Sequence, residues 1–323
     1  MTDSPRPCHS GTVPPRSHRP RGTRSGAAAA AIALALGACT SAPASRSADP
    51  DAVVVASFNF AESELVAELY AQVLEDAGLT ITRMPRVGTR ELLEPALERG
   101  LVDVVPEYAG SLLEFLSDRQ RAGHDIDRVV ERLDAALDQR GLVALEPAPA
   151  QNRNALALSP TRAAVGYDTV SDLTGVAAAW SIGGPPECPQ RPLCLPGFES
   201  VYGLRFEEFV PLDAGGPLTF EALRTGTVDV AVVFTTEGRL VTDDLVLLRD
   251  DLHLQPAENV TPIVRRQVLG RVGPELADRL NAVSAALTTI ELRVLNLRVA
   301  EGAGVATVAR KWLTDRGLLT DVG

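Results

Sequence analysis

The chain has 323 residues, a formal charge of −11 and 45% hydrophobic residues. The acidic balance argues against nucleic-acid binding and against charge-driven binding to an anionic membrane. The length is about that of two ordinary domains.

Residues 1–38 have the pattern of a bacterial secretory signal. A basic leader precedes the apolar stretch GAAAAAIALALGAC, which ends at Cys39 and is too short to span a bilayer. Leu36-Gly37-Ala38-Cys39 matches a lipobox, so we expect Cys39 to be the first mature residue and to carry lipid. The alternative is an ordinary signal cleaved nearby. Residues 39–51 would then form a flexible tether.

Removal of this signal makes the chain more acidic. Residues 1–38 hold five Arg and one Asp, so the remainder has 26 basic and 41 acidic residues and a formal charge of −15. We therefore expect the membrane to be contacted only through the lipid anchor.

From Ala52 onward, apolar strands alternate with amphipathic helices. The strand–helix–strand–helix–strand order predicts a parallel sheet with right-handed crossovers. The expected strands are 52–58, 79–87, 101–108 and 142–149, and the expected helices are 62–78, 89–100 and 125–141.

A second series of the same kind follows. Its expected strands are 154–160, 180–184, 205–212 and 227–234, with helices at 171–179, 198–203 and 216–226. Later strands at 245–251 and 260–266 precede a helical tail at 274–289, 289–300 and 304–317. We predict one lobe from 52–151 plus 257–323, and a second from 152–256.

One phrase occurs in both series. ALERGLVDVVPEY ends at Tyr108 and ALRTGTVDVAVVF ends at Phe234, and both contain Ala-Leu-x-x-Gly-x-Val-Asp-Val. Each aromatic falls at the carboxyl end of a strand, where open α/β sheets bind ligands. We expect both rings to line one cleft, unless the likeness is a coincidence of strand composition. Asp103 and Asp229 are expected to cap or brace the helix–strand turns.

Cys188 and Cys194 lie in the exported, proline-rich segment ECPQRPLC, where a disulfide is expected. A metal site is the alternative, but His124 and His253 have no ligand spacing to this pair. Nucleophile-elbow, Walker and dinucleotide motifs are absent from the sequence. We therefore expect no enzyme, no metal and no cofactor.

Three segments carry a family resemblance: ASFNFAES, GTRELLEPALERGLVDVVPEYAGSLLEFL and LQPAENVTPIVRR. Together they resemble the osmoprotectant substrate-binding proteins, the glycine betaine/choline/carnitine receptors of bacterial ABC importers. The resemblance covers nearly all of residues 52–315.

The resemblance implies an α/β fold: a bilobed, type II-like periplasmic-binding-protein clamp whose two lobes are joined by two crossing segments. It also implies an exported, lipid-anchored receptor on the extracytoplasmic face, which delivers a small solute to an ABC permease and its ATPase. We expect a monomer. A solute sensor and an enzyme on the same scaffold are the alternatives from other classes.

Family likeness also suggests site residues. Such receptors hold a quaternary ammonium against aromatic faces, whose quadrupole attracts the cation. Tyr108 matches the aromatic that follows Pro-Glu, and Ser111 matches a hydroxyl three residues later. Phe234, followed by Thr235, matches an aromatic of the second lobe. Arg191 resembles the arginine that pairs with the ligand carboxylate, although it could be an ordinary loop residue.

The sequence departs from the family pattern at several positions. Phe58 stands where the family usually has Lys, in a segment that also holds Asn59 and Phe60. A common tyrosine is missing near Asn154, and Glu258 replaces another. Glu258 could pair with a protonated amine or accept hydrogen bonds from a polar ligand, or it could be exposed. The expected ligand is a quaternary ammonium or betaine-like zwitterion, with another small polar solute as the alternative.

Overall fold

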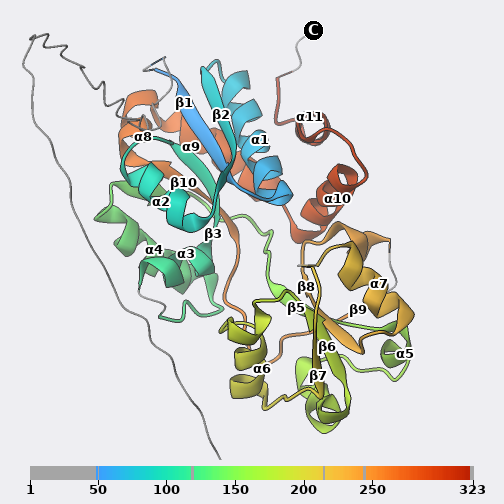
Figure 1. The fold of residues 1–323 in the computed structure, drawn as a ribbon. Helices are drawn as coiled ribbons and strands as arrows, with labels where there is room; N and C mark the ends of the chain where they lie inside the picture. The colour runs from blue at the N-terminus through green and yellow to red at the C-terminus, as the bar shows by residue number, and fades with distance from the viewer. Residues whose placement is uncertain (1–48, 50, 118–119, 214, 243–244, 321–323) are drawn as a thin grey trace, which may run out of the picture. The chain divides into compact units, whose positions relative to one another are not determined.

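The computed structural model describes residues 49, 51–117, 120–213, 215–242 and 245–320. The predicted signal, Cys39 and nearly all of the predicted tether lie outside these residues. Two five-stranded sheets with surrounding helices make up the described part of the chain (Figure 1). None of the helices in these ranges combines the length and hydropathy needed to cross a membrane.

The first sheet has the order β2-β1-β3-β10-β4. Its strands are β1 (Val53–Phe58), β2 (Ile81–Gly88), β3 (Val104–Tyr108), β4 (Leu142–Ala144) and β10 (Val260–Arg265). As predicted, β1 runs parallel to both β2 and β3. β10 is antiparallel to β3 and β4, because it enters the sheet on the return from the second lobe.

Helices cover both faces of this sheet, and alternate β1 residues point to each face. Val53 and Val55 share a core with α1 (Ala61–Asp76), α9 (Pro274–Ala286), α10 (Thr289–Ala300) and α11 (Val305–Asp315). Val54 and Ala56 share the other core with α2 (Arg90–Glu98), α3 (Ala109–Leu116) and α4 (Ile126–Asp138). α3 and the short α8 (Arg266–Val272) were not predicted, because each begins directly after a strand.

The second sheet repeats this arrangement with the order β7-β6-β8-β5-β9. Its strands are β5 (Asn154–Leu158), β6 (Ser181–Gly184), β7 (Glu208–Pro211), β8 (Val230–Phe234) and β9 (Val246–Leu248). The helices are α5 (Pro160–Ala163), α6 (Leu195–Tyr202) and α7 (Pro217–Thr225), with 3₁₀ turns η3 (Cys188–Gln190) and η4 (Gly238–Val241). The helix predicted at 171–179 is instead two 3₁₀ turns, η1 (Val170–Gly175) and η2 (Ala177–Ala179), separated just after Gly175.

The repeated sequence phrase forms the same structure in both lobes. Gly100 (φ 72°) and Gly226 (φ 69°) end α2 and α7 in the left-handed region, which favours glycine. The following aspartates then bind the neighbouring strand: Oδ2 of Asp103 accepts from Val54 N at 3.0 Å, and Oδ2 of Asp229 accepts from Ser181 N at 2.8 Å.

An arginine completes each of these contacts. Arg265 donates to Asp103 and Arg162 donates to Asp229, both at 2.8 Å. The aspartates therefore brace neighbouring strands, rather than the helix–strand turns that were expected, and they do so in the same way in both lobes.

Two segments cross between the sheets, one from β4 to β5 and one from β9 to β10. They meet at a bridge between Gln151 and Asn259, and Asn152 N donates to Glu258 O at 3.0 Å. A third contact comes from α10, which packs on η4. A Cβ on Gly238 would lie 2.5 Å from Leu297 N, so only glycine allows this approach.

Candidate functional site

An aromatic column stands at the carboxyl ends of β1 and β3. The ring centroids of Phe58 and Phe60 are 5.8 Å apart, and those of Phe60 and Tyr108 are 6.2 Å apart. The guanidinium carbon of Arg90 lies 5.6 Å from the Phe58 centroid, at the other end of the column. Phe58 is buried, whereas Phe60 is 39% exposed. Tyr108 is half-buried, so Phe60 is the most accessible member of the column.

Tyr108 lies in the PEYAG segment, and α3 begins at the next residue. Hydrogen bonds from the start of α3 to the second crossing segment hold Tyr108 in place. Ala109 N donates to Asn259 O at 3.1 Å, and Gly110 N donates to Ala257 O at 2.9 Å. A Cβ on Gly110 would lie 2.8 Å from that Ala257 oxygen, so the second crossing segment requires glycine here.

Ser111 and Glu258 bind one another at the start of α3. Oε1 of Glu258 accepts from Ser111 Oγ at 2.5 Å, and Oε2 accepts from Ser111 N at 3.0 Å. Glu258 is only 5% exposed. Burial raises the pKa of Glu258 to about 7, against the opposing effects of the Ser111 hydrogen bonds and the charge of Arg90.

Arg90 forms a bidentate ion pair with Glu107, with contacts of 2.9 and 2.8 Å. Glu107 is 3% exposed, so its charge is compensated almost entirely inside the protein. Arg90 was not predicted as a site residue, although it lies in the same family-like segment as Tyr108. The ion pair fixes the cation that faces Phe58.

Glu62 was also missed, and it accepts three hydrogen bonds. Tyr108 Oη and Asn152 Nδ2 donate to its Oε1 at 2.6 and 2.8 Å, and Asn296 Nδ2 donates to its Oε2 at 2.6 Å. Burial, followed by the charge of Glu62, raises the pKa of Tyr108 well above its usual value. The Tyr108 hydroxyl is therefore a donor at physiological pH.

The second-lobe candidates gather at the carboxyl end of β8. Phe234 is half-buried and pairs with Asn154 across the sheet. Its ring packs on Gly215, where an added Cβ would lie 3.3 Å from Phe234 Cδ2. Thr235 binds the first crossing segment: its Oγ1 donates to Gln151 O at 2.8 Å and accepts from Arg153 N at 2.9 Å.

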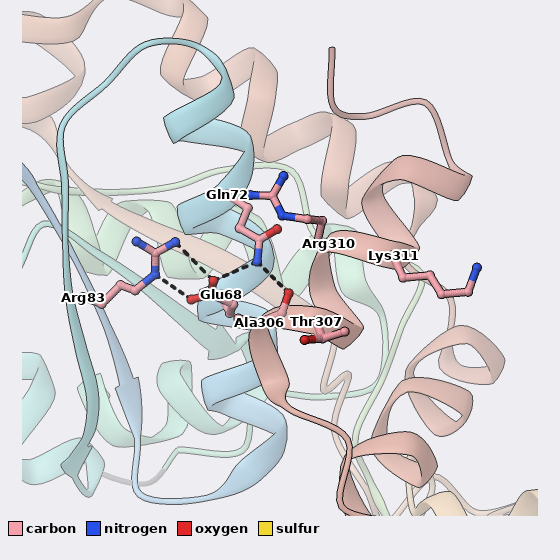
Figure 2. A pocket seen from close by; sticks show the side chains of 7 residues that line it. All are labelled: Glu68, Gln72, Arg83, Ala306, Thr307, Arg310 and Lys311. Atoms are coloured by element: carbon pink, nitrogen blue, oxygen red, sulfur yellow. Dashed lines mark hydrogen bonds and ion pairs between the residues drawn. The ribbon is translucent and has the colours of Figure 1, made fainter. Parts of the chain in front are cut away.

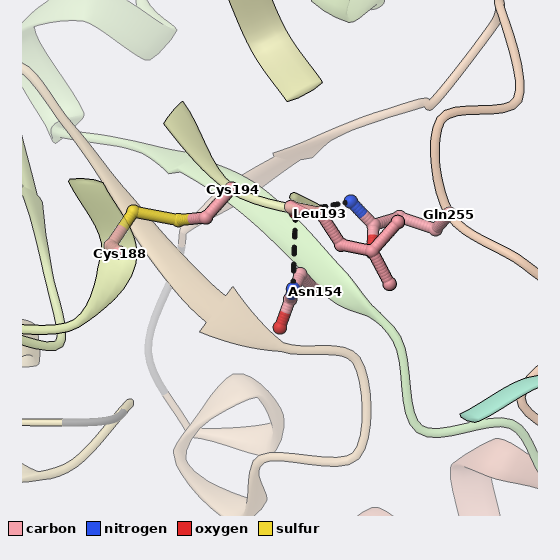
Figure 3. Close-up of a disulfide and its surroundings, with 5 residues drawn as sticks. All are labelled: Asn154, Cys188, Leu193, Cys194 and Gln255. Atoms are coloured by element: carbon pink, nitrogen blue, oxygen red, sulfur yellow. Dashed lines mark hydrogen bonds between the residues drawn. A yellow bond between two sulfur atoms is a disulfide. The ribbon is translucent and has the colours of Figure 1, made fainter. Parts of the chain in front are cut away.

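Cys188 and Cys194 are joined by a disulfide whose Cα atoms are 5.3 Å apart (Figure 3). Leu193 O, beside the disulfide, accepts from Asn154 Nδ2 at 3.3 Å and from Gln255 Nε2 at 2.9 Å. The disulfide loop is thus tied to both β5 and the second crossing segment.

Arg191 lies in the same loop and is exposed. The pKa of Glu91 is lowered mainly by a hydrogen bond with Thr89, and the charge of Arg191 contributes a smaller part. Since Glu91 lies at the start of α2, Arg191 acts electrostatically on the first lobe.

A pocket of about 650 Å³ lies away from the aromatic column, between α1, β2 and α11 (Figure 2). Gln72 donates to Glu68 Oε1 at 2.8 Å and to Ala306 O at 2.9 Å, and Arg83 pairs with Glu68. The residues that line the pocket are Glu68, Gln72, Arg83, Ala306, Thr307, Arg310 and Lys311. This charged surface pocket shares none of its lining with the predicted site.

The structure thus sorts the predicted site residues into groups. Phe58, Phe60 and Tyr108 form the column, and Asn59 is an exposed neighbour whose N–H donates to Gly88 O at 3.1 Å. Ser111 pairs with Glu258 next to it. The second-lobe group consists of Asn154, Arg191, Phe234 and Thr235.

Comparisons with known proteins agree with this architecture. Residues 51–315 match the family described as the substrate binding domain of the ABC-type glycine betaine transport system. The glycine-betaine-binding protein of Pseudomonas aeruginosa is 32% identical over 300 residues, 88% of this chain and 94% of that protein. The glycine betaine-binding protein YehZ of Escherichia coli is 29% identical over 270 residues, 79% of this chain and 88% of that one.

A solved structure supports the fold. The crystal structure of a glycine betaine/carnitine/choline ABC transporter protein superposes with a TM-score of 0.75 at 22% identity, covering 82% of this chain and 99% of that one. The match of the family over both lobes is decisive. The chain belongs to the family of substrate-binding domains of ABC-type glycine betaine transport systems.

Proposed function

We propose that this protein captures a small quaternary ammonium or betaine-like zwitterion against the accessible parts of Phe60 and Tyr108. The observation that carries the proposal is the aromatic column, in which the 39% exposed Phe60 stacks between the buried Phe58 and the half-buried Tyr108. A methylated ammonium over an aromatic face gains about 0.5–2 kcal/mol per contact. Proteins commonly bind quaternary ammonium ions against aromatic faces of this kind.

Nearby charge supports the same ligand class. Glu62 is buried beside the column at 7% exposure, and its carboxylate accepts hydrogen bonds from the Tyr108 hydroxyl and from two side-chain amides. Buried carboxylates attract a cation more strongly than exposed ones, because the surroundings screen them less. Phe234 would supply an aromatic wall from the second lobe, and Arg191 would receive the ligand carboxylate, with Asn154 and Thr235 beside them.

In the proposed cycle, the ligand shifts an equilibrium between open and closed lobes. The closed form delivers the solute to an ABC permease, which a cytoplasmic ATPase drives. The protein would act as a monomer, without a catalytic step, on the extracytoplasmic face and anchored by lipid on Cys39.

Isothermal titration with glycine betaine, choline, carnitine and proline tests the ligand class. We expect Phe60→Ala and Tyr108→Ala to weaken binding of a methylated ammonium by about 3- to 30-fold, the range for one cation–aromatic contact. Phe115→Ala is the matched control, because Phe115 is 37% exposed but lies on α3, outside the column.

Two results would contradict the proposal. One is equal loss of affinity in Phe60→Ala and Phe115→Ala. The other is the absence of binding to every methylated ammonium together with a thermal shift from a different polar solute, which would retain the receptor and replace its ligand.

A further inference from the structure

Glu62 occupies an unusual position for a carboxylate. It lies in the first turn of α1, two residues after the exposed Phe60, yet it is only 7% exposed itself. A buried carboxylate is unfavourable unless hydrogen bonds compensate for its lost hydration. The three donors of Glu62 provide this compensation, and they come from separate parts of the chain.

Each donor belongs to a different functional element. Tyr108 is the aromatic at the end of β3, Asn152 lies in the first crossing segment, and Asn296 lies on α10. Asn296 Nδ2 also donates to Thr236 O at 2.9 Å, just after β8 in the second lobe. One carboxylate therefore connects an aromatic of the ligand site with both lobes.

The contact between α10 and the second lobe is close enough to transmit this connection. Arg293 Nε donates to Thr235 O at 2.5 Å, one residue before the carbonyl that Asn296 binds. Gly238 allows the η4 backbone to lie directly on Leu297. Through these contacts, the position of the Asn296 side chain is coupled to the backbone at the carboxyl end of β8, where Phe234 lies.

We propose that Glu62 is a positioning residue that fixes the Tyr108 ring for ligand binding and links it, through Asn296, to the second lobe. The inference rests on the proposed function for its ligand-binding half. Its chemical basis is acceptor number: a carboxylate has two accepting oxygens, one for Tyr108 and Asn152 and the other for Asn296.

Glutamine is the decisive substitution because it has nearly the same shape. In Glu62→Gln, one oxygen becomes an NH₂ group, which cannot accept from Asn296 if the remaining oxygen faces Tyr108, or the reverse. The variant cannot accept all three hydrogen bonds, so at least one of them is lost. Glu64→Gln is the matched control, because Glu64 lies in the same turn and pairs with Arg86 at the surface.

The first measurement is the Kd for glycine betaine and choline. We expect Glu62→Gln to raise it about tenfold, the size of one hydrogen bond to a charged group. The same substitution should have an effect at least about threefold smaller in a Tyr108→Phe background, which lacks the hydroxyl. An equal loss in both backgrounds would show that Glu62 does not act through Tyr108 and would overturn the inference.

The second measurement needs no ligand. Hydrogen exchange of the ligand-free protein, read by mass spectrometry, should be faster in Glu62→Gln over residues 234–241 and over α10. Glu64→Gln should exchange like the wild type. Unchanged exchange in Glu62→Gln would refute the link to the second lobe. Wild-type protein that binds neither these two solutes nor carnitine would refute the proposed ligand class instead, so the two failures are distinguishable.

Discussion

The Glu258 carboxyl should make the stability of the first lobe fall as the pH rises through neutrality. Burial raises its pKa from the ordinary 4.5 to about 7. Between these values the folded protein keeps a proton that the unfolded chain has released, so protonation favours folding. The contribution is fully present below pH 4.5 and is lost as the pH rises through 7.

The magnitude follows from the width of that window. Each pH unit between the two pKa values changes the free energy of unfolding by about 1.4 kcal/mol, so the whole window corresponds to about 3 kcal/mol. Glu258→Gln should keep a hydrogen bond with Ser111 and cannot titrate. The variant should match the wild type near pH 5 and be more stable by up to about 3 kcal/mol at pH 8.

Fluorescence-detected unfolding in urea at several pH values can measure this difference. Trp312 lies in a core of the first lobe and Trp180 in a core of the second. A Trp180→Phe background therefore makes fluorescence report the first lobe alone. Glu94, whose pKa burial also raises to about 7, titrates in both proteins and cancels in the comparison. A wild-type minus variant difference that stays constant from pH 5 to 8 would refute the reasoning.

Three further substitutions or treatments test the site's framework. Gly110→Ala should destabilise the protein by about 1–3 kcal/mol, because its Cβ would strike the Ala257 oxygen; an unchanged melting temperature would contradict this. Arg90→Ala should lower the free energy of unfolding by about 3–5 kcal/mol by leaving Glu107 buried without its cation, whereas the exposed Arg128→Ala should change it by less than about 0.5 kcal/mol. Reduction of the second-lobe disulfide, which closes a short loop, should lower stability by about 2 kcal/mol in calorimetry, and no change in that lobe's transition would argue against it.

Local patterns in the sequence were sufficient for most of the fold. The repeated Gly-x-Val-Asp-Val phrase predicted matching helix–strand units, and in both sheets the strand that follows this phrase lies between one parallel and one antiparallel neighbour. α3 was missed because AGSLLEFL is a short apolar run with no N-cap residue, and its first N–H groups are instead satisfied by the second crossing segment. Such a helix depends on tertiary contacts that periodicity does not record.

The site was less predictable because its supports are distant in sequence. Tyr108 and the Phe58–Phe60 pair were found from the repeat and the family-like motifs. Glu62 was not, since its partner Asn296 is 234 residues away. Glu258 was expected either buried, where it could accept hydrogen bonds, or exposed, and the structure shows it buried with Ser111 as its hydrogen-bond partner. A sequence motif identifies a site residue, but its hydrogen-bond partners are known only once the fold brings distant segments together.

The paired aspartates described above give this protein an internal replicate. Asp103 and Asp229 make the same carboxylate contacts with the neighbouring strand and an arginine, but their side chains are 0% and 21% exposed. Because Asp229 also accepts from Ser181 Oγ, the same Asp→Asn change in each lobe would compare two corresponding sets of contacts, one buried and one partly exposed, within a single chain.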